Sequence, residues 1–213
     1  NLVEAQYLLR RPRFNATFGV AHYSLDGTLD DELSFAADGL VFDDPPASSV
    51  RSRLNSAYLY LTGNHSANLS STVGLSYTSF DDRALGISVG RWNPKFGLQW
   101  KPGAAFALRL AALKSAKRVL AANQSIEPTQ IAGFNQFFDD LNNQSSTRYG
   151  IGVDLAPTND LQLGLELSRR KVGAQGQPGV PDRNEKSGRA YLYLTPSSRW
   201  SLESELVHDE FAR

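Results

Sequence analysis

ANLSSTVGLSY, residues 67–77, is the stretch of sequence that decides the fold. Its odd-numbered positions are mostly apolar: Ala67, Leu69, Ser71, Val73, Leu75 and Tyr77. Its even-numbered positions are small or polar: Asn68, Ser70, Thr72, Gly74 and Ser76. Because successive side chains of a strand point to opposite sides, this period of two predicts a β-strand with one apolar and one polar face.

The same alternation recurs along the chain. Residues 161–167 carry leucine at every odd position, and residues 149–155 alternate Tyr, Ile, Val and Leu with Gly, Gly and Asp. Segments of this kind predict about ten antiparallel strands. Their expected ranges are 3–10, 14–23, 51–61, 67–78, 95–101, 104–115, 148–155, 161–171, 188–195 and 199–208.

Strand length and link length favour a membrane barrel over a soluble β-sandwich or a lipocalin-like binder. Most of the expected strands are about as long as the roughly 9–11 residues that cross a bilayer when tilted. Short turns rich in Gly, Pro, Asn and Ser alternate with long polar links, as in barrels with short periplasmic turns and long external loops. We expect the long external loops near residues 24–50, 79–94, 116–147 and 172–187.

Two segments within these links leave alternatives open. Residues 84–91 alternate in polarity, so they either extend the fifth strand across a bulge near Trp92 or form a structured loop. Residues 129–138 alternate weakly and are a candidate for a short strand inside the third long loop.

The expected fold is therefore an all-β, antiparallel, up-and-down transmembrane β-barrel, with residues 1–213 forming a single barrel section. If the short turns are periplasmic, the first strand enters from outside and the tenth ends outside. We therefore expect an even-stranded fragment of a larger barrel.

Aromatic residues near the strand ends predict two girdles at the membrane interfaces. The group near the short turns is Phe14, Trp100, Phe106, Tyr193 and Trp200. The group near the long loops is Tyr23, Tyr77, Phe80 and Tyr149.

Composition and motifs argue against several classes of function. Lys and Arg together number 22 and Asp and Glu together 22, so no net charge favours nucleic acid. The chain has no Cys, and its three His are isolated in sequence, so we expect no metal site and no cofactor. No nucleophile elbow or phosphate-binding loop is present, so we expect no catalytic residues and no enzyme.

The polar strand faces are the best candidate for a functional surface. If their apolar neighbours face lipid, these side chains face the lumen, where charges of both signs tune selectivity or pair with one another to plug or stiffen the wall. The expected lumen-facing residues are Lys95, Gln99, Arg109, Arg148, Asp154, Gln162, Glu166, Glu203 and Glu205.

Four segments resemble known families. NPKFGLQWKP (93–102) and FALRLAA (106–112) look like a strand–turn–strand of TonB-dependent receptor barrels. IEPTQIAGFNQFFDD (126–140) and RYGIG (148–152) resemble the barrel region of outer-membrane proteins that carry tetratricopeptide repeats. The resemblance implies a Gram-negative outer-membrane barrel, but these residues contain no plug, TonB box or repeat, so neither energised uptake nor polymer export is carried over.

The first functional hypothesis is a pore or transport conduit for a solute or an exported polymer. The alternative is a non-transporting outer-membrane anchor or scaffold that binds a partner through its loops or a further soluble domain. In both cases we expect a bacterial outer-membrane location. The expected partners are outer-membrane lipid, lipopolysaccharide and a periplasmic or repeat-domain protein, with no nucleic acid.

Overall fold

The computed structural model describes residues 1–29, 48–83, 86–116, 125–136, 140, 144–173 and 182–212. Its strands are β1 (Leu2–Arg10), β2 (Phe14–Leu29), β3 (Ser48–Ser66), β4 (Leu69–Asp82), β5 (Ile87–Gly103), β6 (Phe106–Ala116), β7 (Gln130–Ile131), β8 (Phe134–Asn135), β9 (Ser145–Thr158), β10 (Leu161–Gly173), β11 (Arg183–Ser197) and β12 (Trp200–Ala212). Among these residues, no helix is long and apolar enough to cross a membrane.

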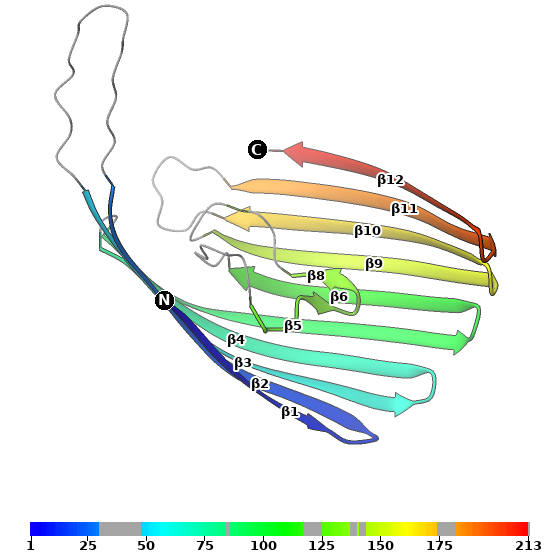
Figure 1. Cartoon of the computed structure of the whole chain (residues 1–213), viewed down its shortest axis with the longest axis horizontal. Helices are drawn as coiled ribbons and strands as arrows, with labels where there is room; N and C mark the ends of the chain where they lie inside the picture. The colour runs from blue at the N-terminus through cyan, green and yellow to red at the C-terminus, as the bar shows by residue number, and fades with distance from the viewer. Residues whose placement is uncertain are drawn as a thin grey trace, which may run out of the picture.

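Ten of the strands form one curved antiparallel sheet in the order β1-β2-β3-β4-β5-β6-β9-β10-β11-β12 (Figure 1). The predicted all-β antiparallel architecture and all ten predicted strands are confirmed. The sheet is not closed, because β1 and β12 form its two edges. The hairpin β7–β8 is separate from the sheet and lies over its middle strands (Figure 1).

The expectation of a long loop at 79–94 is wrong, and of the two alternatives for residues 84–91 the extension of the fifth strand is confirmed from Ile87 on. β4 runs to Asp82 and β5 begins at Ile87, and the pairing of the two strands shows no bulge near Trp92. The physical reason is a hydrophobic cluster of Tyr23, Leu54 and Phe80, against which Ile87 and Val89 pack. The extra apolar contacts extend both strands beyond the predicted ends.

The other expected long loops fall partly outside the described residues, at 30–47, 117–124, 137–139, 141–143 and 174–181. The short turns between β1 and β2, β3 and β4, β5 and β6, β9 and β10, and β11 and β12 all lie at one end of the sheet (Figure 1). The strand ends that the remaining links join lie at the opposite end of the sheet, which we call the long-link end.

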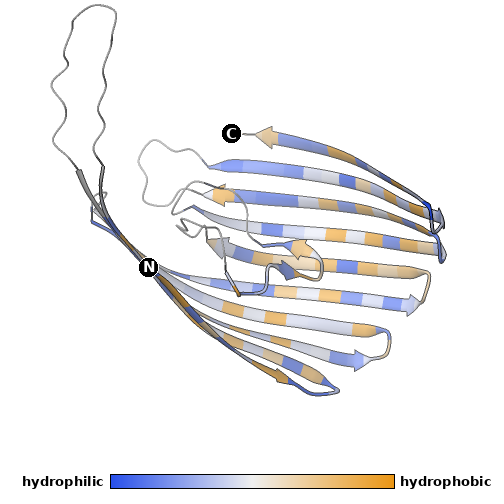
Figure 2. Ribbon diagram, viewed as in Figure 1, coloured by the Kyte–Doolittle hydropathy of each residue, from blue (hydrophilic) through white to orange (hydrophobic). Residues whose placement is uncertain are grey.

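Apolar and polar residues alternate along many of the strands (Figure 2), and because successive side chains point to opposite sides, the sheet has one apolar and one polar face. We call the face that packs against residues 125–136 the inner face and the opposite one the outer face. The outer face carries exposed apolar side chains: Phe18, Val20, Leu59, Leu61, Val73, Leu75, Phe96, Ile151, Leu165 and Leu167. Val73 is 54% exposed and Leu165 49%, whereas Arg148 on the inner face is 7% exposed. A soluble sheet would reverse this distribution.

The aromatic residues divide between the two faces. Trp100 and Phe106 pack edge to face on the outer face beside a short turn, with ring centroids 6.2 Å apart. Tyr23 and Phe80 were expected in the girdle near the long loops but lie buried on the inner face. Their burial in an apolar cluster on the inner face explains the difference.

Candidate functional site

Residues 125–136 cross the inner face of the sheet and form the centre of the candidate site. The segment begins beside β1, where Gln6 Nε2 donates a hydrogen bond to the carbonyl of Ile126 at 2.7 Å. The backbone N–H of Ile126 donates to Glu4 Oε2 at 2.7 Å. Gln6 also donates to the hydroxyl of Tyr58 on β3 at 3.0 Å. Even-numbered residues of β1 therefore anchor a segment about 120 positions later in the sequence.

A buried ion pair joins the segment to β5. Lys95 Nζ lies 3.6 Å from Glu127 Oε1, and the two side chains are 1% and 0% exposed. Lys95 also donates to Ser76 Oγ at 2.8 Å and lies over the ring of Tyr60 at 5.4 Å. The Tyr60 hydroxyl donates to Glu127, and Gln136 Nε2 donates to the Tyr60 hydroxyl at 3.1 Å. Burying both charges costs free energy that these hydrogen bonds and the pairing offset.

Phe134, the first residue of β8, places its ring between two arginines of the sheet. Phe134 is 0% exposed. The guanidinium carbons of Arg109 and Arg148 lie 5.3 and 5.4 Å from its ring centroid. A Cβ added to Gly150 would lie 2.3 Å from a ring atom of Phe134, so only glycine leaves room for the ring at this point of β9. The ring therefore lies against Gly150 and between the guanidinium groups of Arg109 and Arg148, a site that we call the Phe134 socket.

The same two arginines belong to a network of ion pairs across β6, β9 and β10. Arg109 binds Asp154 through two hydrogen bonds, from Nε at 2.7 Å and from Nη2 at 3.0 Å. Arg109 Nη1 and Arg148 Nη2 lie 3.5 and 3.1 Å from the two oxygens of Glu166. Tyr191 on β11 donates a further hydrogen bond to Asp154. Two cations and two carboxylates thus neutralise one another.

A second ion-pair cluster lies nearer the long-link end. Arg170 Nη1 donates to Glu185 at 2.7 Å, and Arg170 also pairs with Asp140. Arg183 lies 3.3 Å from Asp140 and pairs with Glu185. The inner face of β9–β11 therefore carries both signs of charge in paired form.

Three glycines of the inner face each lie opposite a tyrosine on the neighbouring strand. The three pairs are Gly19 with Tyr58, Gly74 with Tyr60 and Gly164 with Tyr191. A Cβ on any of these glycines would lie between 2.0 and 2.7 Å from a ring atom of its tyrosine. Each ring therefore lies flat over its glycine.

All nine residues that were expected to face the lumen lie on the inner face of the sheet. The Cα pairing of neighbouring strands shows that they share this face. The structure brings Arg109, Arg148, Asp154 and Glu166 together in one cluster and pairs Lys95 with Glu127. Glu205 pairs with Arg189 at 2.8 Å. The side chains of the other three lie on this face without a hydrogen bond or ion pair to any described residue: Gln99, Gln162 and Glu203.

Sequence reasoning missed the residues of the segment that crosses the inner face, Glu127, Phe134 and Gln136. The signal was present: apolar and aromatic residues stand beside Gly133 in a link that was otherwise read as polar. Glycine at polar-face positions such as Gly150 was a second signal, since a strand interior favours glycine where another group approaches closely.

What the inner face offers chemically is a polar wall lined with paired charges. Within the described residues, no group of three His, Asp or Glu side chains is placed to hold a metal ion. The arrangement is suited to binding and sorting polar molecules in contact with the wall.

Comparison with solved structures gives the same architecture. The apoprotein of the FrpB iron transporter from Neisseria meningitidis aligns with a TM-score of 0.70 and 10% identity, over 99% of this chain and 36% of that one. The outer-membrane channel DcaP of Acinetobacter baumannii gives 0.61 and 10%, over 98% and 55%. The alcaligin outer-membrane receptor FauA of Bordetella pertussis gives 0.55 and 14%, over 99% and 42%.

These likenesses establish the fold, and the chain spans between about a third and just over half the length of these three proteins. No protein-family model and no curated protein sequence matches the chain. The fold is that of outer-membrane β-barrel proteins, among them transporters and channels.

Proposed function

We propose that this chain forms part of the wall of an outer-membrane β-barrel, through whose lumen a solute or an exported polymer passes. The observation that carries the proposal is the contrast between the two faces of the sheet. The outer face exposes apolar side chains on each of β2, β3, β4 and β5, whereas the inner face carries the ion-pair clusters. The fold of the transporters and channels reported above supports the same reading.

The open sheet bears on how the barrel is completed. β1 and β12 leave unpaired backbone groups at the two edges of the sheet, and a lipid bilayer offers no hydrogen-bonding partner for them. We therefore propose that further strands pair with both edges to close the wall.

Within that barrel, residues 125–136 narrow the lumen and set what passes. The segment extends from β1 to β9 across the inner face and is held there by Lys95, Tyr60 and the Phe134 socket. A molecule in the lumen then meets the wall beside this segment, close to Arg109 and Glu166. A wall lined with polar and ion-paired side chains at a constriction favours polar molecules over apolar ones.

Electrical recording in planar bilayers tests the proposal with the full-length protein that carries this chain. We expect a measurable single-channel conductance, and a higher one when residues 126–136 are replaced by a Gly-Ser linker of equal length. Phe96→Ala on the outer face is the matched control and should leave the conductance unchanged. Absence of any channel in both proteins would refute the conduit and support the anchor or scaffold alternative.

Location is tested separately by separating inner and outer membranes on a density gradient. We expect the protein in the outer-membrane fraction, where the apolar outer face of the sheet has lipid to contact. Recovery in the soluble fraction without detergent would contradict the proposal.

A further inference from the structure

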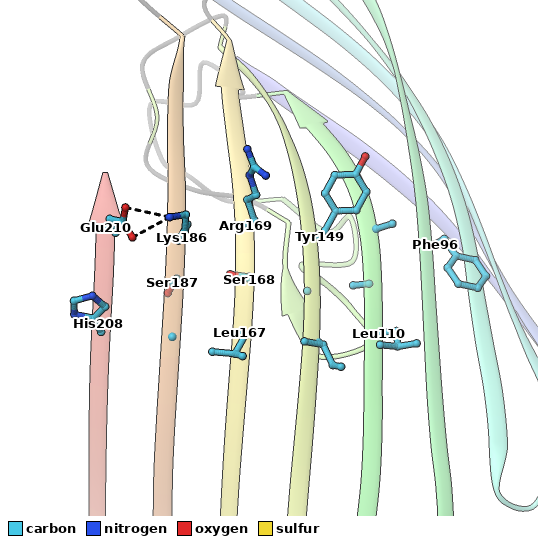
Figure 3. A pocket seen from close by; sticks show the side chains of 15 residues that line it. Phe96, Leu110, Tyr149, Leu167, Ser168, Arg169, Lys186, Ser187, His208 and Glu210 are labelled. Carbon is cyan, nitrogen blue, oxygen red and sulfur yellow. Dashed lines mark hydrogen bonds and ion pairs between the residues drawn. The ribbon is translucent and has the colours of Figure 1, made fainter. Parts of the chain in front are cut away.

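The outer face is hollowed over β5, β6 and β9–β12 (Figure 3). The hollow has a volume of about 770 Å³, which is within the roughly 300–1,000 Å³ of small-ligand sites. It lies on the face opposite the inner segment, so neither the ion-pair clusters nor residues 125–136 line it.

The register of the sheet gives the hollow an apolar floor. Leu110, Ile151, Leu167 and Gly188 are Cα partners in one row across β6, β9, β10 and β11. Gly188 has no side chain, and a Cβ built there would meet only Leu167 Cδ2, at 3.4 Å. The missing side chain opens the space between Leu167 on β10 and His208 on β12, which are the two Cα partners of Gly188.

Two residues further toward the long-link end, the neighbouring row is polar. Tyr149, Arg169, Lys186 and Glu210 are Cα partners across β9 to β12. Lys186 Nζ lies 3.1 Å from both carboxylate oxygens of Glu210 (Figure 3). The Arg169 side chain is exposed, and its guanidinium makes no hydrogen bond or ion pair with any residue that the structure describes. The row therefore combines two cations with one carboxylate.

An apolar hollow directly beside a cationic row has the polarity of a lipid molecule. Acyl chains fit the floor of Leu110, Ile151 and Leu167, and an anionic headgroup then lies at Arg169 and Lys186. A guanidinium binds phosphate oxygens in a bidentate manner, and the Lys186 ammonium, which also pairs with Glu210, is a second donor beside it. Arg169 is available for this role because no described carboxylate occupies it.

We propose that this hollow is a binding site for a phosphorylated lipid of the membrane leaflet at the long-link end. The proposal rests on the proposed function, because the outer face contacts lipid only if the sheet spans a membrane. It goes further by assigning a selective site, in which Arg169 and Lys186 hold the phosphate and Gly188 leaves room for an acyl chain.

The test measures lipid binding to the full-length protein in a neutral detergent, from the lipid-dependent rise in melting temperature. The probes are phosphatidic acid and phosphatidylcholine with identical acyl chains, and inorganic phosphate. We expect phosphatidic acid to bind at least about tenfold more tightly than phosphatidylcholine, which corresponds to about 1.4 kcal/mol. Inorganic phosphate alone should give no shift.

Four variants locate the site. We expect Arg169→Ala to lose the preference for phosphatidic acid, and Gly188→Leu to weaken both lipids because its side chain fills the hollow. Arg53→Ala removes an exposed outer-face arginine from β3, and Val73→Phe adds apolar bulk to the outer face of β4. Both controls should bind as the unchanged protein does.

Equal affinity for the two lipids, or unchanged preference in Arg169→Ala, would overturn the proposal. A shift with inorganic phosphate as large as that with phosphatidic acid would also overturn it, because it would show a free-anion site. A protein that conducts ions but shows no lipid preference disproves the lipid site and leaves the conduit standing. A protein that binds the lipid selectively but forms no channel disproves the conduit and leaves the lipid site standing.

Discussion

Removing the ring of Phe134 should release residues 125–136 from the inner face. The ring is 0% exposed, covers Gly150 and lies between Arg109 and Arg148 at 5.3 and 5.4 Å. Truncating a buried phenylalanine to alanine costs about 3–5 kcal/mol, and here the cost falls on the docking of the segment and not on the sheet. A loss of about 3 kcal/mol raises the population of the released segment roughly 100-fold.

Hydrogen–deuterium exchange of the full-length protein measures this effect. The amide of Gln136 is the reporter, because it donates to the carbonyl of Thr129 at 3.0 Å and loses that bond when the hairpin opens. Peptides covering 125–136 in Phe134→Ala should exchange about 100-fold faster, while peptides from β9 keep their protection. Phe96→Ala, which truncates an outer-face phenylalanine on β5, is the matched control. Unchanged exchange of the segment in Phe134→Ala would refute the socket as its anchor.

Three further substitutions test other parts of the structure. Lys95→Met leaves the buried Glu127 without its ammonium partner and should weaken docking by about 3–5 kcal/mol in the same exchange assay, with most of it recovered in Lys95→Met/Glu127→Gln. Leu165→Lys should reduce stability in liposomes by up to about 2–4 kcal/mol in denaturant titration, depending on its depth, and an unchanged titration would place that side chain away from lipid. Gly164→Ala puts a Cβ 2.0 Å from Tyr191 Cζ and should cost about 1–3 kcal/mol in that titration, whereas adding Tyr191→Ala should relieve the clash.

The period-two pattern predicted the strands and their faces because both depend on residues adjacent in sequence. Val73 and Leu165 are exposed on one face, and Arg148 lies on the other, as the alternation indicated. Strand ends were predicted less well, because Ile87 joins a cluster with Leu54 that forms only when distant strands meet.

The alternation of apolar and polar residues could not predict that residues 125–136 dock on the sheet. Their contacts join Gln6 to Ile126 and Tyr60 to Gln136, which are 120 and 76 positions apart. No local pattern encodes a pairing over such separations. The charged strand residues were predicted from alternation, but Glu127, the partner of Lys95, lies in a link whose course depends on the finished sheet.

The glycine–tyrosine pairs of the inner face bear on how the wall assembles. Alternating polarity rejects a strand that slips by one residue, because its apolar side chains would then face the wrong side, but it accepts a slip of two. The pair of Gly164 and Tyr191 removes that ambiguity, since a two-residue slip would place the ring over Gln162 or Glu166, each of which has a Cβ where the ring must lie. Gly19 with Tyr58 and Gly74 with Tyr60 apply the same selection on the other side of the sheet. These pairs therefore select one strand register among several that the hydrophobic pattern alone would allow.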